Sequence, residues 1–163
     1  MKKVWALLLA VMMMCLMAGC GTEVVLDVTQ FSRISKDRLI AIMGEQDDYD
    51  EMTILTSNGK ARFEIMKYRQ DGAEYTFFVQ SNKVAALEIR HHDDNRTEYK
   101  DGAWKSVFRQ YGVTGGSEKP GNPRIIENLG SEIEQASIGI TEGDDWKEYI
   151  GYICFEYDGT YMH

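Results

Sequence analysis

The clearest cluster of side chains that could bind a metal ion is His91-His92-Asp93-Asp94, because imidazole and carboxylate groups are common metal ligands. Neighbouring residues on a strand point to opposite faces, so the two histidines cannot readily reach one ion. We interpret the cluster as the polar end of a strand that enters a loop. The sequence therefore predicts no metal site and no other cofactor.

Two acidic segments, Asp47–Glu51 and Asp144-Asp145, offer oxygen ligands for calcium. Calcium takes about six to eight oxygens from a loop of defined spacing, and neither segment has that spacing. We interpret both as solvated loops. Their charge would repel anionic lipid headgroups and could attract a basic partner.

No sequence pattern indicates catalysis. Gly115–Lys119 lacks the full phosphate-loop pattern, and neither a serine nucleophile turn nor a zinc-protease helix is present. Cys154 lies in the apolar run Tyr152–Phe155, which favours a small buried residue over a nucleophile. We expect a protein that is not an enzyme; the alternative is a hydrolase with two carboxylates facing each other across a cleft.

The N-terminus has the pattern of a secretory signal peptide. Met1-Lys2-Lys3 is a short basic start, and Val4–Ala18 carries no charge and is almost wholly apolar. A membrane-spanning anchor is the alternative, but the apolar run is short for a span of about 20 residues and no basic cluster follows it.

The end of this segment, Leu16-Met17-Ala18-Gly19-Cys20, resembles the lipobox of bacterial lipoproteins. The resemblance implies cleavage between Gly19 and Cys20 and lipidation of Cys20 with acyl chains such as palmitate. Residues 1–19 would then be the signal peptide, and 20–23 a lipidated N-terminus with a short linker. The implied location is the outer face of the cell membrane, or the outer membrane in a cell with two membranes.

Composition limits the partners of the exported chain. The 163 residues include 18 basic and 26 acidic ones, for a net charge of −8, and loss of Lys2 and Lys3 makes the balance more acidic still. Such a charge argues against nucleic-acid binding, which needs clustered basic residues. Of three cysteines, Cys15 is lost and Cys20 carries lipid, so Cys154 has no partner for a disulfide.

Residues 24–163 read as a single α+β domain. An extended segment or strand over 24–28 precedes a helix over 36–43, which Ser35 caps and Gly44 ends. Alternating patterns predict strands over 52–57, 61–69, 74–80 and 84–91. The turns Asn58-Gly59, Asp71-Gly72 and Ser81-Asn82 would join these strands into an antiparallel meander.

The second half is predicted less sharply. Helical spacing over 103–111 ends at Gly112, and strands could occupy 124–129, 135–141 and 148–158. The segment 113–123 contains both prolines and reads as a loop or internal boundary. Helix, glycine and strands thus occur twice, which hints at a degenerate tandem repeat.

The first half also resembles a known group of proteins. The resemblance rests on the helix ending Met43-Gly44-Glu45, then Lys67-Tyr68, Asp71-Gly72, Glu74–Phe78 and Asn82-Lys83-Val84. This order is similar to small exported lipoproteins of the BamE and beta-lactamase-inhibitor-protein-like group, over about residues 33–91. It implies one or two helices packed on an antiparallel sheet, and a role in protein contact or envelope assembly.

The aromatic residues suggest where a partner could bind. Most lie on predicted strands and are expected to fill the core, but those on a solvent-facing side could form a patch. The candidates are Tyr68, Phe78 and Tyr152, of which Phe78 lies opposite Tyr75 and Phe77 on one strand. The expected function is a lipid-anchored envelope protein with a non-catalytic protein-interaction role; the alternative is a binder of small ligands or glycans.

Overall fold

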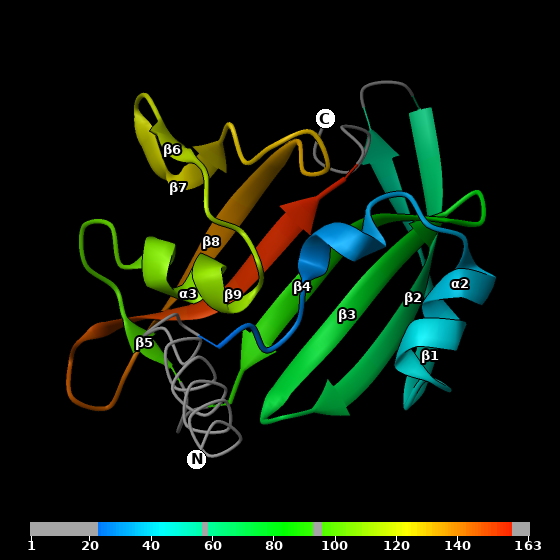
Figure 1. The fold of residues 1–163 in the computed structure, drawn as a ribbon, viewed down its shortest axis with the longest axis horizontal. Coiled ribbons are helices and arrows are strands. Elements are labelled where there is room, and N and C mark those ends of the chain that lie inside the picture. The colour runs from blue at the N-terminus through cyan, green and yellow to red at the C-terminus, as the bar shows by residue number, and fades with distance from the viewer. Residues whose placement is uncertain (1–22, 57–58, 93–95, 158–163) are drawn as a thin grey trace, which may run out of the picture.

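A computed structural model describes residues 23–56, 59–92 and 96–157 (Figure 1). The expected signal peptide (1–19), Cys20, Asn58 and Asp93-Asp94 lie outside the described residues. The described chain forms one antiparallel sheet in the order β1-β2-β3-β4-β9-β8-β7-β6, with the short β5 also paired to β9. Two α-helices and a 3-10 helix pack on the sheet, so the expected α+β class with a strand meander is confirmed.

The first half contains η1(Val28–Phe31), α2(Lys36–Met43), β1(Asp48–Thr56), β2(Gly59–Gln70), β3(Ala73–Gln80) and β4(Lys83–His91). Helix α2 has its predicted bounds. The Ser35 hydroxyl accepts the Arg38 N–H at 3.2 Å, and Gly44, at φ 85°, donates its N–H to the Ile40 carbonyl at 2.8 Å. These two caps satisfy backbone groups that the helix itself leaves unpaired.

Two-residue turns join β2 to β3 and β3 to β4. Asp71-Gly72 has φ of 52° and 74°, and Ser81-Asn82 has 49° and 64°. Positive φ at both central residues matches the twist of a hairpin, and asparagine, aspartate and glycine tolerate it best. The meander of the first half therefore forms as the sequence predicts.

The second half contains β5(Thr97–Glu98), α3(Trp104–Gln110), β6(Ser117–Lys119), β7(Asn122–Glu127), β8(Gln135–Glu142) and β9(Glu148–Glu156). The expectation that 113–123 is a loop is wrong in part, because 117–119 and 122–123 lie in strands. A β6–β7 hairpin turns at Pro120-Gly121, and Pro123 lies inside β7, before the residues that pair with β8. Proline is tolerated there because Pro123 lies next to a shift in the β6–β7 register and precedes the part of β7 that pairs with β8.

The segment 24–28, expected to be a strand or extended chain, does not join the sheet. Residues 24–27 lead into η1, which begins at Val28. The Val25 N–H donates to the Gln110 carbonyl at 2.8 Å, and the Val28 N–H donates to the Tyr111 carbonyl at 3.1 Å. The Tyr157 hydroxyl donates to the Val28 carbonyl at 2.7 Å. The N-terminal segment is thus fixed to the end of α3 and to the end of β9.

The main core lies between the sheet and its helices, which all cover the same face (Figure 1). Strand register places apolar residues in continuous rows across both halves. One such row is Met66, Phe77, Leu87, Phe155, Ala136 and Ile126. Because β4 pairs directly with β9, the core continues across the junction of the halves.

The opposite face of the sheet carries a second, smaller core, made of Ala61, Phe63, Phe78, Ala85, Ala86 and Cys154. Strand β2 contributes to both cores: Ala61 and Phe63 are buried on this face, whereas Met66 and Tyr68 are buried under the helices. Within the described part of the chain, no helix has the length and apolarity needed to cross a membrane.

Candidate functional site

The face of the sheet away from the helices carries a row of charged and aromatic side chains. Register aligns Arg69, Glu74, Arg90, Tyr152 and Gly139 across β2, β3, β4, β9 and β8. Arg69 pairs with Glu74 at 3.1 Å. We call these five residues the open-face row; it crosses the β4–β9 junction and so belongs to both halves.

Tyr152 lies flat at the centre of this face. A Cβ atom added to Gly139 would lie 1.9 Å from the Tyr152 ring, so the ring occupies the space that any side chain at 139 would need. On β4, the guanidinium carbon of Arg90 is 5.5 Å from the centre of the same ring, and Arg90 pairs with Glu88 at 2.9 Å. An arginine over an aromatic ring is a favourable cation–π arrangement.

The three aromatic residues predicted as a patch do not come together. Tyr68 is buried at 3% exposure under the helices, where its ring meets Phe77 edge-on at 5.6 Å. Phe78 is on the opposite face but is 7% exposed, inside the second core. Only Tyr152 is partly accessible on the open face. The misplacement of Tyr68 arises because β2 changes its buried side along its length, which alternation alone does not reveal.

A shallow groove beside α2 holds the two facing carboxylates that a hydrolase would need. It measures about 500 Å³, and Tyr49, Glu51, Arg62 and Glu64 line it. Glu51 and Glu64 are direct partners on β1 and β2, and the Tyr49 hydroxyl lies 3.2 Å and 3.0 Å from their oxygens. Asp48–Glu51, expected in a loop, thus form the start of β1.

Each carboxylate in this groove is already paired with a basic side chain. The hydrogen bond from Arg62 lowers the pKa of Glu51, and the hydrogen bond from Lys36 lowers the pKa of Glu64. Desolvation and the two carboxylates together raise the pKa of Tyr49 to about 12. Glycoside hydrolysis needs one carboxylic acid that keeps its proton, with a raised pKa. In this groove the pKa of each glutamate is lowered instead. We therefore interpret the groove as a structural network of ion pairs.

A second hollow, of about 260 Å³, lies between the β3–β4 end of the first half and the C-terminal end of α3. We call it the junction cavity. Its lining consists of Val25, Asp71, Ala73, Tyr75, His91, Gln110 and Tyr111. The Tyr111 hydroxyl lies 3.1 Å from Nε2 of His91.

Burial sets the protonation states of the side chains that line this cavity. It lowers the pKa of His91, so the imidazole is held neutral over a wider pH range. Burial, and secondarily the charge of Asp71, raises the pKa of Tyr75, and burial also raises that of Tyr111. Both phenols therefore keep their protons at neutral pH. Sequence reasoning missed this cavity because Asp71, His91 and Tyr111 come from three separate segments.

The two histidines of the predicted cluster lie in different surroundings. His91 lines the junction cavity, whereas His92 is exposed. Across the described ranges, no three side chains among histidine, cysteine, aspartate and glutamate gather closely enough to hold an ion.

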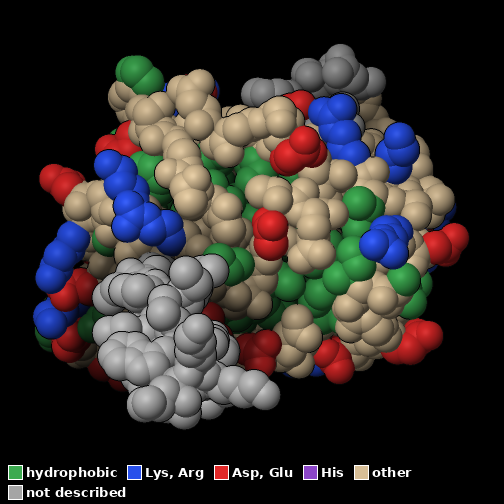
Figure 2. All heavy atoms as spheres, in the orientation of Figure 1, with side chains coloured by type: hydrophobic (Ala, Val, Ile, Leu, Met, Phe, Trp, Pro, Cys, Tyr) green, Lys and Arg blue, Asp and Glu red, His purple; other side chains and the backbone are tan. Residues whose placement is uncertain are grey.

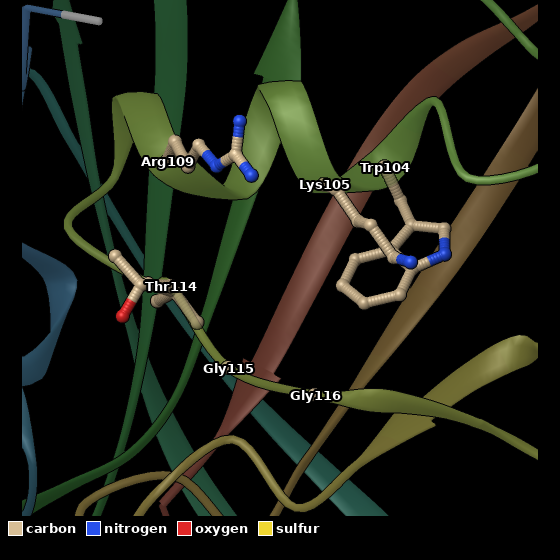
Figure 3. A pocket seen from close by; sticks show the side chains of 7 residues that line it. Trp104, Lys105, Arg109, Thr114, Gly115 and Gly116 are labelled. Carbon is tan, nitrogen blue, oxygen red and sulfur yellow. The ribbon is translucent and has the colours of Figure 1, made fainter. Parts of the chain in front are cut away.

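A third hollow lies between α3 and the loop that follows it (Figure 3). Lys105 and Arg109 project from α3, and basic side chains gather over this helix on the molecular surface (Figure 2). The hollow measures only about 40 Å³, which is room for about one water molecule. It is too small for an organic ligand.

Cys154 is buried on β9, as the sequence predicts. Burial, aided by the charges of Glu156 and Glu88, raises the pKa of its thiol. A thiol that resists ionisation is a poor nucleophile.

No family model matches this chain, and no curated protein matches it. A solved structure with some similarity is a cysteine-rich secretory protein from Staphylococcus aureus subsp. aureus Mu50, at 8% sequence identity and a TM-score of 0.43. The match covers 83% of this chain and 48% of that one, so this chain spans about half the length of that protein.

Proposed function

We propose that the chain is a lipid-anchored envelope lipoprotein whose open-face row binds a protein partner, without catalysis. The anchor is supported by Ala18-Gly19-Cys20 after an apolar, uncharged run. Two acyl chains would hold such a protein stably, which a single chain does not. The site of attachment would be the outer face of the cell membrane, or the outer membrane where a second membrane exists.

The position of Val25 makes the proposed tether short. Its N–H is hydrogen-bonded to Gln110, and only residues 21–24 separate it from Cys20. A fully extended chain from Cys20 to Val25 reaches about 18 Å. The domain would therefore stay near the membrane, with the α3 end closest to it.

The observation that carries the interaction role is the Arg90–Tyr152 pair at the β4–β9 junction. Tyrosine and arginine are enriched at protein interfaces because they combine a large contact area with polar groups. Here they lie on a sheet face that no helix of the described chain covers, between two halves that could both contact one partner.

We also propose that the two halves are copies of one unit, as in the beta-lactamase-inhibitor-protein-like group that the sequence resembles. Support comes from their order: α2 precedes the meander β1–β4, and α3 precedes β6–β9. Superposing residues 35–91 on 103–156 should match the strands one for one with the helices aligned. Helices that superpose on different strands would contradict the proposal.

Mass spectrometry of the membrane fraction tests the anchor. We expect a chain that begins at a diacylated Cys20, and a Cys20→Ser variant that is no longer retained with the membrane. A full-length chain with an unmodified Cys20 would refute the anchor.

Site-specific photocrosslinking tests the interaction face. A benzophenone amino acid in place of Tyr152 should give a discrete crosslinked product in native membranes. The matched control places it at Tyr49, which is 42% exposed in the groove beside α2. Equal products from both positions, or none from position 152, would refute binding at the open face.

A further inference from the structure

We propose that the junction cavity binds a small organic cation, such as a primary amine. This site is separate from the open-face row, and the inference does not depend on the lipid anchor. It rests on which polar groups meet in the cavity and on their charges.

The polar groups converge from distant parts of the chain. Asp71 and Tyr75 come from the β2–β3 turn and β3, His91 from the end of β4, and Tyr111 from the residue after α3. Val25 completes the lining from the N-terminal segment, held there by its hydrogen bond to Gln110. A concave site with a few convergent polar groups is the usual form of a small-ligand site.

The charge of the lining favours a cation. Among the described residues that line the cavity, Asp71 is the one acidic side chain, and none is lysine or arginine. The other titratable lining groups are His91, Tyr75 and Tyr111, which burial keeps uncharged at neutral pH. This differs from the groove beside α2, where Arg62 and Lys36 already pair with the carboxylates.

The remaining groups suit an ammonium ion. A tyrosine hydroxyl donates one hydrogen bond and its oxygen can accept others, so Tyr111 can accept an N–H from a ligand as well as contact His91. An amine could thus pair with Asp71 and donate a hydrogen bond to Tyr111.

The volume of the cavity and the number of its charged groups narrow the class of ligand further. At about 260 Å³ the cavity lies just below the range of about 300–1,000 Å³ that is typical of drug-sized ligands. One carboxylate and one imidazole are too few to hold a metal ion. A compact amine fits both limits.

The test uses three probes of equal size and different charge: benzylamine, benzyl alcohol and benzoate. Calorimetry with the purified protein should show saturable binding of benzylamine, and affinities for the other two at least about tenfold weaker, because a hydrogen bond to a charged group contributes about that much. Equal or tighter binding of benzoate or benzyl alcohol would overturn the proposal. So would the lack of saturable benzylamine binding.

Matched variants locate the site. Asp71→Asn should weaken benzylamine binding about tenfold or more with little effect on folding, since asparagine tolerates the φ of 52° at this turn. Asp144→Asn removes the same charge from an exposed turn outside the cavity and should leave the affinity unchanged. Equal losses in both variants would indicate only a general effect of net charge and would refute the site. Thermal unfolding of each variant checks that it is folded.

Discussion

The two faces of strands β3, β4 and β9 differ sharply, although alternating residues of the same segments build both. Under the helices, Phe77, Leu87 and Phe155 are fully buried in one continuous row. On the other side, Glu74, Arg90 and Tyr152 form a row with ion pairs and a cation–π contact. The face under the helices therefore supplies most of the apolar burial. The open-face row, unlike the small core of Phe78 and Cys154 on the same side, can vary its chemistry at little cost to the fold.

The two faces should differ most in how much stability is lost when a side chain is truncated to alanine. Phe77→Ala removes a buried ring and leaves a cavity, so we expect a loss of about 3–5 kcal/mol in the free energy of unfolding. Tyr152→Ala, on the open face, should cost about 1 kcal/mol. Urea unfolding of the mature chain carrying Cys20→Ser measures both. Similar losses would show that the open face is as important for stability as the core.

A smaller effect is expected at Gly139, where the open-face row permits no side chain. Gly139→Ala should lower stability by about 1 kcal/mol, because its Cβ displaces the Tyr152 ring. In a Tyr152→Ala background the same change should cost much less, since the ring is gone. A double-mutant cycle by urea unfolding gives the coupling, expected at about 0.5 kcal/mol or more. Additive effects would contradict the contact between residue 139 and the ring.

The covered face should also show a modest dependence on pH, because its β4 row ends at His91. Burial lowers the folded-state pKa of His91 below the unfolded value of about 6.5. Between these two pKa values the unfolded chain binds more protons, so stability rises with pH and is lost as pH falls below about 6.5. His91→Gln, which cannot titrate, should lose less stability than the unaltered chain between pH 8 and pH 5. An identical pH dependence would show that His91 titrates as it does in the unfolded chain.

The subtlest test concerns Cys154, which belongs to the open side by register yet is 4% exposed. Because burial raises the pKa of its thiol, we expect negligible alkylation by iodoacetamide at pH 8 in the folded chain and rapid alkylation in urea. The Cys20→Ser chain provides a single thiol for this assay. Rapid labelling without urea would mean that the second core is open to solvent.

The sequence predicts the local elements of the first half well. Ser35 and Gly44 set the ends of α2, and Asp71-Gly72 and Ser81-Asn82 set the turns of the meander. Each of these signals acts within a few residues, through capping or through backbone conformation. Elements with such signals can be placed from one sequence.

The features missed are long-range ones. Pairing of β4 with β9 joins residues more than sixty positions apart, and no local pattern specifies it. The open-face row and the junction cavity both depend on this pairing or on the packing of α3. The alternation of Glu88 and Arg90 with Leu87 and Ile89 indicates that one side of β4 faces solvent. It does not indicate that β9 is the strand paired with β4.

Hydroxyl-radical footprinting tests the proposed role of the open face most directly. It compares the oxidation rates of Tyr152 and Tyr49 in native membranes with those in the purified protein. We expect Tyr152 to be protected several-fold in native membranes and Tyr49 to be oxidised equally in both preparations. Equal oxidation of Tyr152 in the two preparations would contradict binding of a partner at this face.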